Sequence, residues 1–170
     1  MQRFLGAAIG LAFAAAAAAQ NFPNKPVTIV VGFEPGGGTD TTARVVAKPL
    51  AENIGQQVVV ENRAGAGGNI AVDYVAKSAP DGYTIVLAHV GALAVNPHLL
   101  KLPYDPLHDL TPLSMAAVFA NVLVVQPSLK LSSLADYVNL ARANPGKITY
   151  ASSGIGGAGH LAGELLRGWI

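Results

Sequence analysis

Three glycine-rich turns constrain the fold of this chain more than any other feature of its sequence. They read Phe33-Glu-Pro-Gly-Gly-Gly-Thr-Asp40, Asn62-Arg-Ala-Gly-Ala-Gly-Gly-Asn69 and Ser152-Ser-Gly-Ile-Gly-Gly-Ala-Gly-His160, here the first, second and third glycine turns. Each follows an apolar, β-like run and precedes a helix-like run. Glycine allows the positive φ angles and close backbone approach that such turns need. Because free N–H groups and the helix dipole at a helix start attract anions, three such turns predict a carboxylate or phosphate site.

The runs in the first two-thirds of the chain alternate between strand and helix. Strands are expected over 26–33, 57–61 and 83–88, and helices over 39–53 and 67–78. This spacing predicts a parallel sheet with right-handed crossovers, hence an α/β fold. Ligands of such sheets bind outside the carboxyl ends of the strands, where the first two glycine turns would lie.

The last third of the chain, after an irregular proline-rich stretch over 97–113, predicts a second α/β segment. Strands are expected over 116–125 and 147–151, and helices over 132–143 and 157–170. Two or three strands are few for an independent sheet. The final helix also carries an apolar stripe that no later element covers, so we expect this to be a truncated or frame-shifted reading of a longer protein.

The first residues have the pattern of a secretory signal. Arg3 supplies the positive charge, residues 4–19 are uncharged and rich in alanine, and cleavage is expected between Ala19 and Gln20. The chain has no cysteine, so neither a lipoprotein anchor nor a disulfide framework is expected. Lys and Arg number 11 and Asp and Glu number 10. Without Arg3 these charges balance, which argues against a nucleic-acid partner.

Several motifs in order resemble the Bug-type solute receptors of tripartite tricarboxylate transporters. They include the strand and turn over 25–40, Val58-Val-Val-Glu-Asn-Arg-x-Gly-Ala-Gly-Gly-Asn69, Pro80-Asp-Gly-Tyr-Thr84, Leu102-Pro-Tyr-Asp-Pro106, Pro145-Gly-Lys-Ile-Thr-Tyr150 and Gly156-Gly-Ala-Gly-His-Leu161. The resemblance implies a periplasmic binding protein of type II architecture, whose two α/β lobes close on a small carboxylate and deliver it to membrane subunits of the transporter. It implies a monomer in the full-length form and no cofactor.

The resemblance also divides the chain and assigns ligand-binding roles. It implies a signal peptide over 1–19, a first lobe over 20–113 and a partial second lobe over 114–170, with the C-terminal half of the family fold missing and binding therefore impaired. The resemblance also implies ligand-binding roles for Gly68 and His89, but less specifically. The main ligand-binding residues that it implies lie on two opposed turns: Phe33, Gly36, Gly37, Thr39 and Asp40 on one, and Ser152, Ser153 and Gly154 on the other.

Some of these residues have ordinary alternatives. Thr39 or Asp40 could simply cap a helix, since both are favoured N-cap residues. His160 is more often a packed or solvent-facing histidine than a ligand residue, and His98 and His108 are expected at the surface. Glu34 replaces a small residue of the family pattern. A carboxylate pointing into an anion site would oppose binding, so we expect Glu34 to point outward.

Two other functions remain open at this point. Gly154-x-Gly156-x-x-Gly159 has the spacing of a dinucleotide-binding enzyme, although the acidic residue expected about twenty positions later would lie beyond Ile170. A secreted hydrolase could be imagined from Ser153, His160 and Asp40 by residue type alone. No hydrolase, zinc-protease or Walker motif occurs in the sequence, and no metal-ligand cluster is visible. The sequence therefore predicts a receptor rather than an enzyme.

Overall fold

The computed structural model describes residues 22–152 and 154–170. The expected signal segment over 1–19 and the candidate ligand residue Ser153 lie outside the described residues. Within the part that is described, no helix has the length and apolar character needed to span a membrane. We call residues 22–113 the first unit and residues 114–170 the second unit.

The first unit is built on a three-stranded parallel sheet. Its strands are β1 (Val27–Val31), β2 (Val58–Asn62) and β3 (Thr84–Leu87), arranged in the order β2-β1-β3. β1 is central, and its β-branched run is almost wholly buried, as expected for a strand covered on both faces. The sequence prediction of three parallel strands is confirmed: β1 and β3 are slightly shorter than the apolar runs that contain them, and β2 is shifted by one residue from the run over 57–61.

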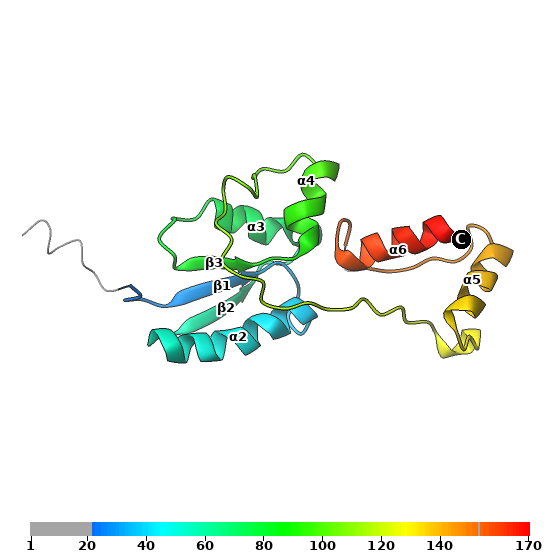
Figure 1. The fold of residues 1–170 in the computed structure, drawn as a ribbon, viewed down its shortest axis with the longest axis horizontal. Helices are drawn as coiled ribbons and strands as arrows, with labels where there is room; N and C mark the ends of the chain where they lie inside the picture. The colour runs from blue at the N-terminus through cyan, green and yellow to red at the C-terminus, as the bar shows by residue number, and fades with distance from the viewer. Residues whose placement is uncertain (1–21, 153) are drawn as a thin grey trace, which may run out of the picture.

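Helices cover both faces of this sheet (Figure 1). On one face, α2 (Gly38–Ile54) packs Ala43 and Ala47 against Ile29 and Val31. The other face carries α3 (Asn69–Ala76), whose Val72 lies in a second buried cluster with Ala92 and Tyr104. α2 ends at Gly55, which adopts a left-handed conformation with φ of 66°, as predicted for this glycine. The α/β fold class is therefore confirmed.

Three short helical segments in the first unit differ from the prediction, although the first of them overlaps the start of the helix expected over 67–78. They are the 3-10 turn η1 (Ala66–Gly68), the π-helical turn η2 (Gly91–Val95) and the short helix α4 (Asn96–Leu99). Residues 91–99 contain one glycine and one proline and show no clear apolar period, so the local sequence pattern gives little sign of a helix there. Tertiary contacts of the buried Ala92 and Asn96 hold this segment against α3 instead.

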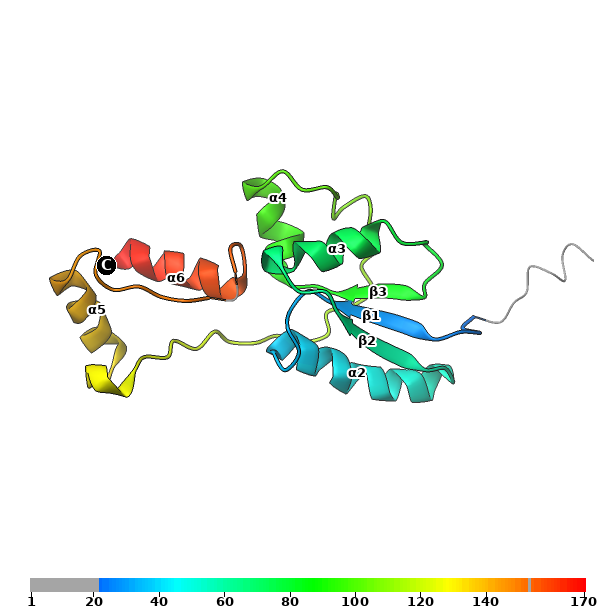
Figure 2. The ribbon, with the colours of Figure 1, turned by 180° about the vertical axis from the view of Figure 1, so that it is seen from behind.

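The second unit contains helices but no paired strand among its described residues (Figure 2). Its elements are η3 (Pro127–Leu129), α5 (Leu134–Ala143) and α6 (Ala158–Trp169). The strands predicted over 116–125 and 147–151 are wrong, since both segments are extended without strand pairing. A β-like sequence becomes a strand only when a neighbouring backbone supplies its hydrogen bonds, and the described residues offer these segments no such neighbour.

α6 packs on the segment that precedes it through Tyr150. The Tyr150 hydroxyl donates to the Glu164 carboxylate at 2.8 Å, and the Tyr150 ring covers Gly163 so closely that a Cβ there would lie 2.4 Å from it. Leu165 and Trp169 are 69% and 75% exposed. Of the predicted apolar stripe, Leu165 is exposed whereas Leu161 and Leu166 are partly buried, so the described residues cover the stripe only in part.

Candidate anion-binding site

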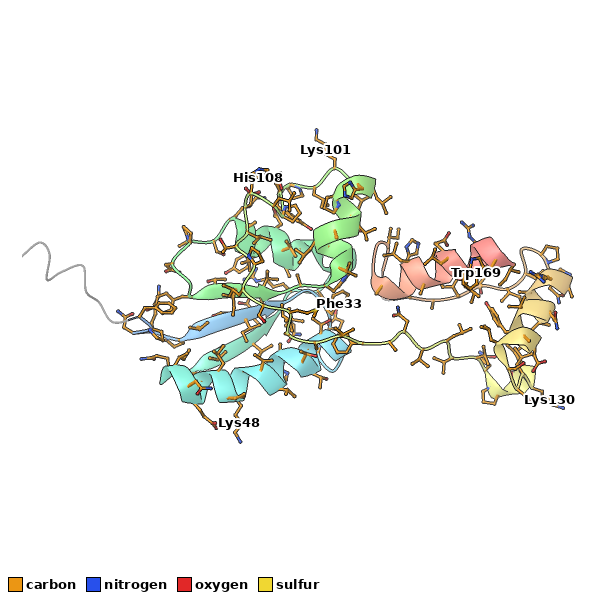
Figure 3. The ribbon with its side chains drawn as sticks, viewed as in Figure 1. Phe33, Lys48, Lys101, His108, Lys130 and Trp169 are labelled. Atoms are coloured by element: carbon orange, nitrogen blue, oxygen red, sulfur yellow. The ribbon has the colours of Figure 1, made fainter. Side chains whose placement is uncertain are left out.

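The carboxyl ends of the three parallel strands bring the first two glycine turns and His89 to one edge of the sheet. Phe33 follows β1, the second glycine turn begins at the end of β2, and His89 follows β3. Figure 3 shows Phe33 at this edge, which faces the start of α6. The first two glycine turns and His89 therefore lie at the carboxyl edge, as predicted.

Phe33, Gly68 and His89 form a contact cluster at this edge. The Phe33 and His89 rings lie 4.8 Å apart between centroids. A Cβ on Gly68 would lie in contact with both rings, 3.4 Å from that of Phe33 and 3.6 Å from His89 Nε2. Gly68 also has a φ of 92°, which favours glycine. Three sequence-predicted site residues are thus neighbours in space.

His89 is held in one tautomer by the backbone. The Gly91 N–H donates to His89 Nδ1 at 2.8 Å, so the neutral ring carries its proton on Nε2 and can donate one hydrogen bond from there. Burial lowers the pKa of His89 below its usual value, and an interaction with the Gly67 backbone opposes this shift only in part. At neutral pH His89 is therefore a neutral donor rather than a cation.

The first glycine turn leads directly into α2 without a side-chain cap. α2 begins at Gly38, its N-cap is Gly37, and no side chain accepts a hydrogen bond from the first helical N–H groups. The prediction that Thr39 or Asp40 caps this helix is wrong, because both already lie inside the first turn. Glu34 is exposed, as expected. The backbone donors at the start of α2 are consequently left for water or an anion.

Asp40 is buried at 2% exposure, and its carboxylate points to partners within the protein. It accepts hydrogen bonds from the Gly36 N–H at 2.8 Å, from Asn62 Nδ2 at 2.9 Å and from Arg44 Nε at 3.0 Å. The Arg44 guanidinium, followed by Gly36 and Asn62, holds the pKa of Asp40 well below its usual range. Asp40 is therefore ionised and fully engaged, and the Gly36 N–H is already occupied.

The third glycine turn docks on the first unit by backbone contacts. A Cβ on Gly67 would lie 2.4 Å from the Ile155 carbonyl oxygen, and a Cβ on Gly91 would lie 2.0 Å from that of Gly156. A Cβ on Gly154 would lie 3.5 Å from the Gly67 nitrogen. The described contacts thus join the third turn to the second turn and η2, whereas Phe119 is the second-unit side chain nearest Gly38.

A buried polar network supports this docking. Asn69 Oδ1 accepts from Asn96 Nδ2 at 2.9 Å and from the Tyr104 hydroxyl at 3.0 Å, and this hydroxyl also lies 2.8 Å from the Ala92 carbonyl oxygen. Burial raises the pKa of Tyr104 to about 12. Asn96 Oδ1 lies beneath Gly156 and accepts no hydrogen bond from the described residues. The network thereby holds in place the Asn96 side chain against which the third turn packs.

The third turn ends in a helix start that resembles the start of α2. The N-cap of α6 is Gly157, with no side-chain cap. Ser152 Oγ accepts from the Gly154 N–H at 3.4 Å, and His160 Nδ1 accepts from the Gly156 N–H at 3.3 Å. Ser152 and His160 therefore shape the turn in which they lie, and the first N–H groups of α6 have no side-chain acceptor among the described residues.

Comparison with known proteins identifies the family. Residues 42–168 match the protein family described as the tripartite tricarboxylate transporter family receptor. The chain belongs to this receptor family. Its members are periplasmic solute-binding receptors and not enzymes. The chain is 46% identical to Protein BugT of Bordetella pertussis over 156 residues, which are 91% of this chain and 48% of that protein.

Solved structures of related receptors share the fold. Rpa4515 of R. palustris with adipate superposes with a TM-score of 0.82 at 42% identity, covering 86% of this chain and 50% of that one. MatC (Rpa3494) of Rhodopseudomonas palustris with bound malate superposes with a TM-score of 0.73 at 31% identity, covering 86% of this chain and 51% of that one. The chain spans about half the length of the curated relatives that it matches.

These findings bear on the two alternative functions. The dinucleotide fingerprint requires a strand immediately before its glycines, and residues 147–151 of this receptor form none. The imagined hydrolase would need a free Asp40, whose carboxylate is taken by Gly36, Arg44 and Asn62. Ser153 lies outside the described residues. His98 and His108 are exposed, as predicted.

Two hollows of the described surface lie away from the glycine turns. One, of about 350 Å³, lies beside α2 and β2 and is lined by residues that include Arg44, Lys48 and Val58. The other, of about 420 Å³, lies beside Lys25, Asp81 and Tyr83 at the amino ends of the strands. Neither gathers helix-start N–H groups, so the glycine turns remain the better candidate site.

Sequence reasoning missed five polar residues that organise the site. Arg44 and Asn62 hold Asp40 in the first turn, whereas Asn69, Asn96 and Tyr104 form the buried network. Asn62, Asn69 and Tyr104 lie within motifs that carried the family resemblance. Asn62 also ends a strand at the carboxyl edge, and that position is a signal that could have identified it.

Proposed function

We propose that this protein is an exported receptor that captures a small carboxylate in the periplasm and delivers it to a tripartite tricarboxylate transporter. The observation that carries the proposal is that α2 and α6 both begin at a glycine N-cap without a side-chain cap. Helix starts of this kind present backbone donors and a favourable dipole to an anion. The ligand would be a mono- or dicarboxylate or an amino-acid-like anion.

The proposed ligand-binding groups are mostly neutral. The first turn would contribute N–H groups around Gly37, Thr39 and Asp40, and the side of the site would be formed by Phe33 and His89. Neutral donors hold a carboxylate without burying a second formal charge, which limits the desolvation cost. Water bridges would let the same turns serve different acids. The complete proposed set is Phe33, Gly36, Gly37, Thr39, Asp40, Gly68, His89, Ser152, Ser153 and Gly154, in which Gly36 would shape the turn because its N–H is bonded to Asp40.

The related structures support this choice of ligand class. Adipate and malate, the ligands named for the two R. palustris proteins, are both small dicarboxylates. The signal-like segment over 1–19 supports export, and the neutral charge balance of the remaining chain supports neither nucleic acid nor an anionic membrane as the partner. We further propose that the full-length form acts as a monomer with the transporter subunits.

Amide NMR spectroscopy tests the proposal on this chain even when binding is weak. We expect malate or adipate to produce saturable shifts in the amide resonances of Gly38, Thr39 and Ala158 at roughly millimolar ligand, which corresponds to about −4 kcal/mol. The amides of Leu134 and Asp136, at the self-capped start of α5, should not move. Absence of saturable shifts at both glycine-capped helix starts, or equal shifts with chloride, would contradict the proposal.

A further inference from the structure

Asp40 connects both ends of the first glycine turn. Its carboxylate accepts directly from the Gly36 N–H at 2.8 Å. It also accepts from Asn62 Nδ2 at 2.9 Å, and the same amide donates to the Phe33 carbonyl oxygen at 3.0 Å. The turn is thereby tied to β2 at its beginning and to α2 at its end. Removal of the Asp40 carboxylate would release Gly36 directly and would leave Asn62 held only by its remaining contacts.

Arg44 compensates the charge of Asp40. Its Nε lies 3.0 and 3.1 Å from the two carboxylate oxygens, and its Nη2 donates to Asn62 Oδ1 at 3.2 Å. The Asp40 side chain is 3% exposed, whereas that of Arg44 is 53% exposed. A lone buried carboxylate beside an anion site would repel the ligand, so this pairing is needed for a site of the proposed kind.

An ionised carboxylate cannot donate a hydrogen bond to another carboxylate. The Asp40 side chain is therefore chemically unsuited to hold the proposed ligand, although its backbone N–H, in the first turn of α2, is well suited. The geometry agrees, because the carboxylate is buried and has three protein partners. The side chain and the backbone of the same residue can thus have different tasks.

We propose that Asp40 is a positioning residue, whose side chain, with Asn62 and Arg44, holds the first glycine turn in the shape that presents its backbone donors to the carboxylate. This inference rests on the proposed function. The shared task of the turn is to hold the carboxylate group that all ligands of this class have in common. Loss of the Asp40 carboxylate should therefore weaken the binding of different carboxylate ligands to the same extent.

The test compares Asp40→Asn and Asn62→Ala with the matched control Asp136→Asn. Asp136 occupies the third position of α5 and accepts the Ser132 N–H at 3.0 Å, as Asp40 does with Gly36 in α2. Titrated by NMR with malate and adipate, Asp40→Asn and Asn62→Ala should each lose at least about tenfold in affinity for both acids, the size of one lost hydrogen bond to a charged group. The Asp136→Asn variant should bind as the wild type does.

A ligand-free spectrum separates this inference from the proposed function. Without ligand, both variants should shift the amides of Phe33 and Gly36 but leave those of β1 in place, which also shows that the chain still folds. Unchanged affinity, tighter binding by Asp40→Asn, or unchanged turn amides would overturn the positioning role. If the wild type binds neither acid while the turn amides shift, the proposed function fails and the structural role of Asp40 in the turn stands.

Discussion

The starts of α2 and α5 share one aspartate arrangement and differ at the N-cap. In both, an aspartate at the third helical position accepts the N–H of the residue before the N-cap: Asp40 accepts that of Gly36, and Asp136 that of Ser132. The N-cap itself differs. Ser133 accepts the Asp136 N–H at 3.1 Å, whereas Gly37 has no side chain to accept anything. The start of α5 thus provides a side-chain acceptor for one of its N–H groups and the start of α2 provides none, which teaches that a single missing hydroxyl can distinguish a structural helix start from a candidate anion site.

The largest effect is expected at the third glycine turn, where α6 shares the open start of α2. In Gly156→Ala the new Cβ would lie 1.7 Å from Asn96 Oδ1, at a φ of 77°. Left-handed strain and overpacking together should lower the free energy of unfolding by about 2–4 kcal/mol. Urea denaturation followed by circular dichroism measures this loss.

Gly146→Ala provides the matched control for that substitution. Gly146 also has a positive φ, of 71°, but a Cβ there would meet nothing within 4 Å. It should lose only about 1–2 kcal/mol from backbone strain. Equal losses in the two variants would show that the third turn does not dock on Asn96 in solution.

The second prediction concerns a substitution that gives α2 the same N-cap residue as α5. Gly37 has φ of −73° and ψ of 168°, which serine adopts readily, and its Cβ would be in ordinary contact with the Glu34 carbonyl oxygen. In Gly37→Ser, the hydroxyl should accept an N–H of the first turn and compete with the ligand. Affinity for malate should fall by up to about tenfold, while stability rises by a few tenths of a kcal/mol, roughly.

The reverse change in α5 sharpens the comparison. Ser133→Ala removes the cap and should cost about 1 kcal/mol of stability without any change in malate affinity. Calorimetric melts and NMR titrations of both variants supply the two readouts. Undiminished malate binding by Gly37→Ser would mean that the open donors of α2 are not those that hold the ligand.

The smallest effects concern acid stability. The pKa of Asp40 is lowered by Arg44, Gly36 and Asn62, whereas that of Asp136 is lowered mainly by the Ser132 N–H. A carboxylate with a lowered folded-state pKa stabilises the protein above its unfolded value, about 3.9, and this contribution is lost as the pH falls further. The melting temperature should therefore be insensitive to these groups between about pH 5 and 8.

Melting curves below about pH 4 check this expectation. The fall in melting temperature on acidification should be reduced most in Asp40→Asn and less in Asp136→Asn, because Asp136 is exposed and Asp40 is buried with an arginine partner. An equal fall in melting temperature on acidification for the two variants would contradict the expected difference between Asp40 and Asp136.

The sequence predicted the first unit well because its signals are local. The β-branched runs, the helical period over Ala43 and Ala47, and the stop at Gly55 each depend on neighbouring residues. The same reasoning failed for 116–125 and 147–151, since apolar β-like composition does not supply a pairing partner. It also failed at α4, where the buried amide of Asn96 rather than any period holds the helix.

For the site, the sequence by itself determined where glycine turns precede helices, and with them the carboxyl-edge location of Phe33, Gly68 and His89. Only the tertiary structure decided that the Asp40 carboxylate turns inward, that the neutral His89 ring carries its proton on Nε2, and that the third turn packs against Gly67 and Asn96. The physical reason is sequence distance. Asn62 lies 22 residues from Asp40 and Tyr104 lies 35 residues from Asn69, so their hydrogen bonds exist only once the chain has folded.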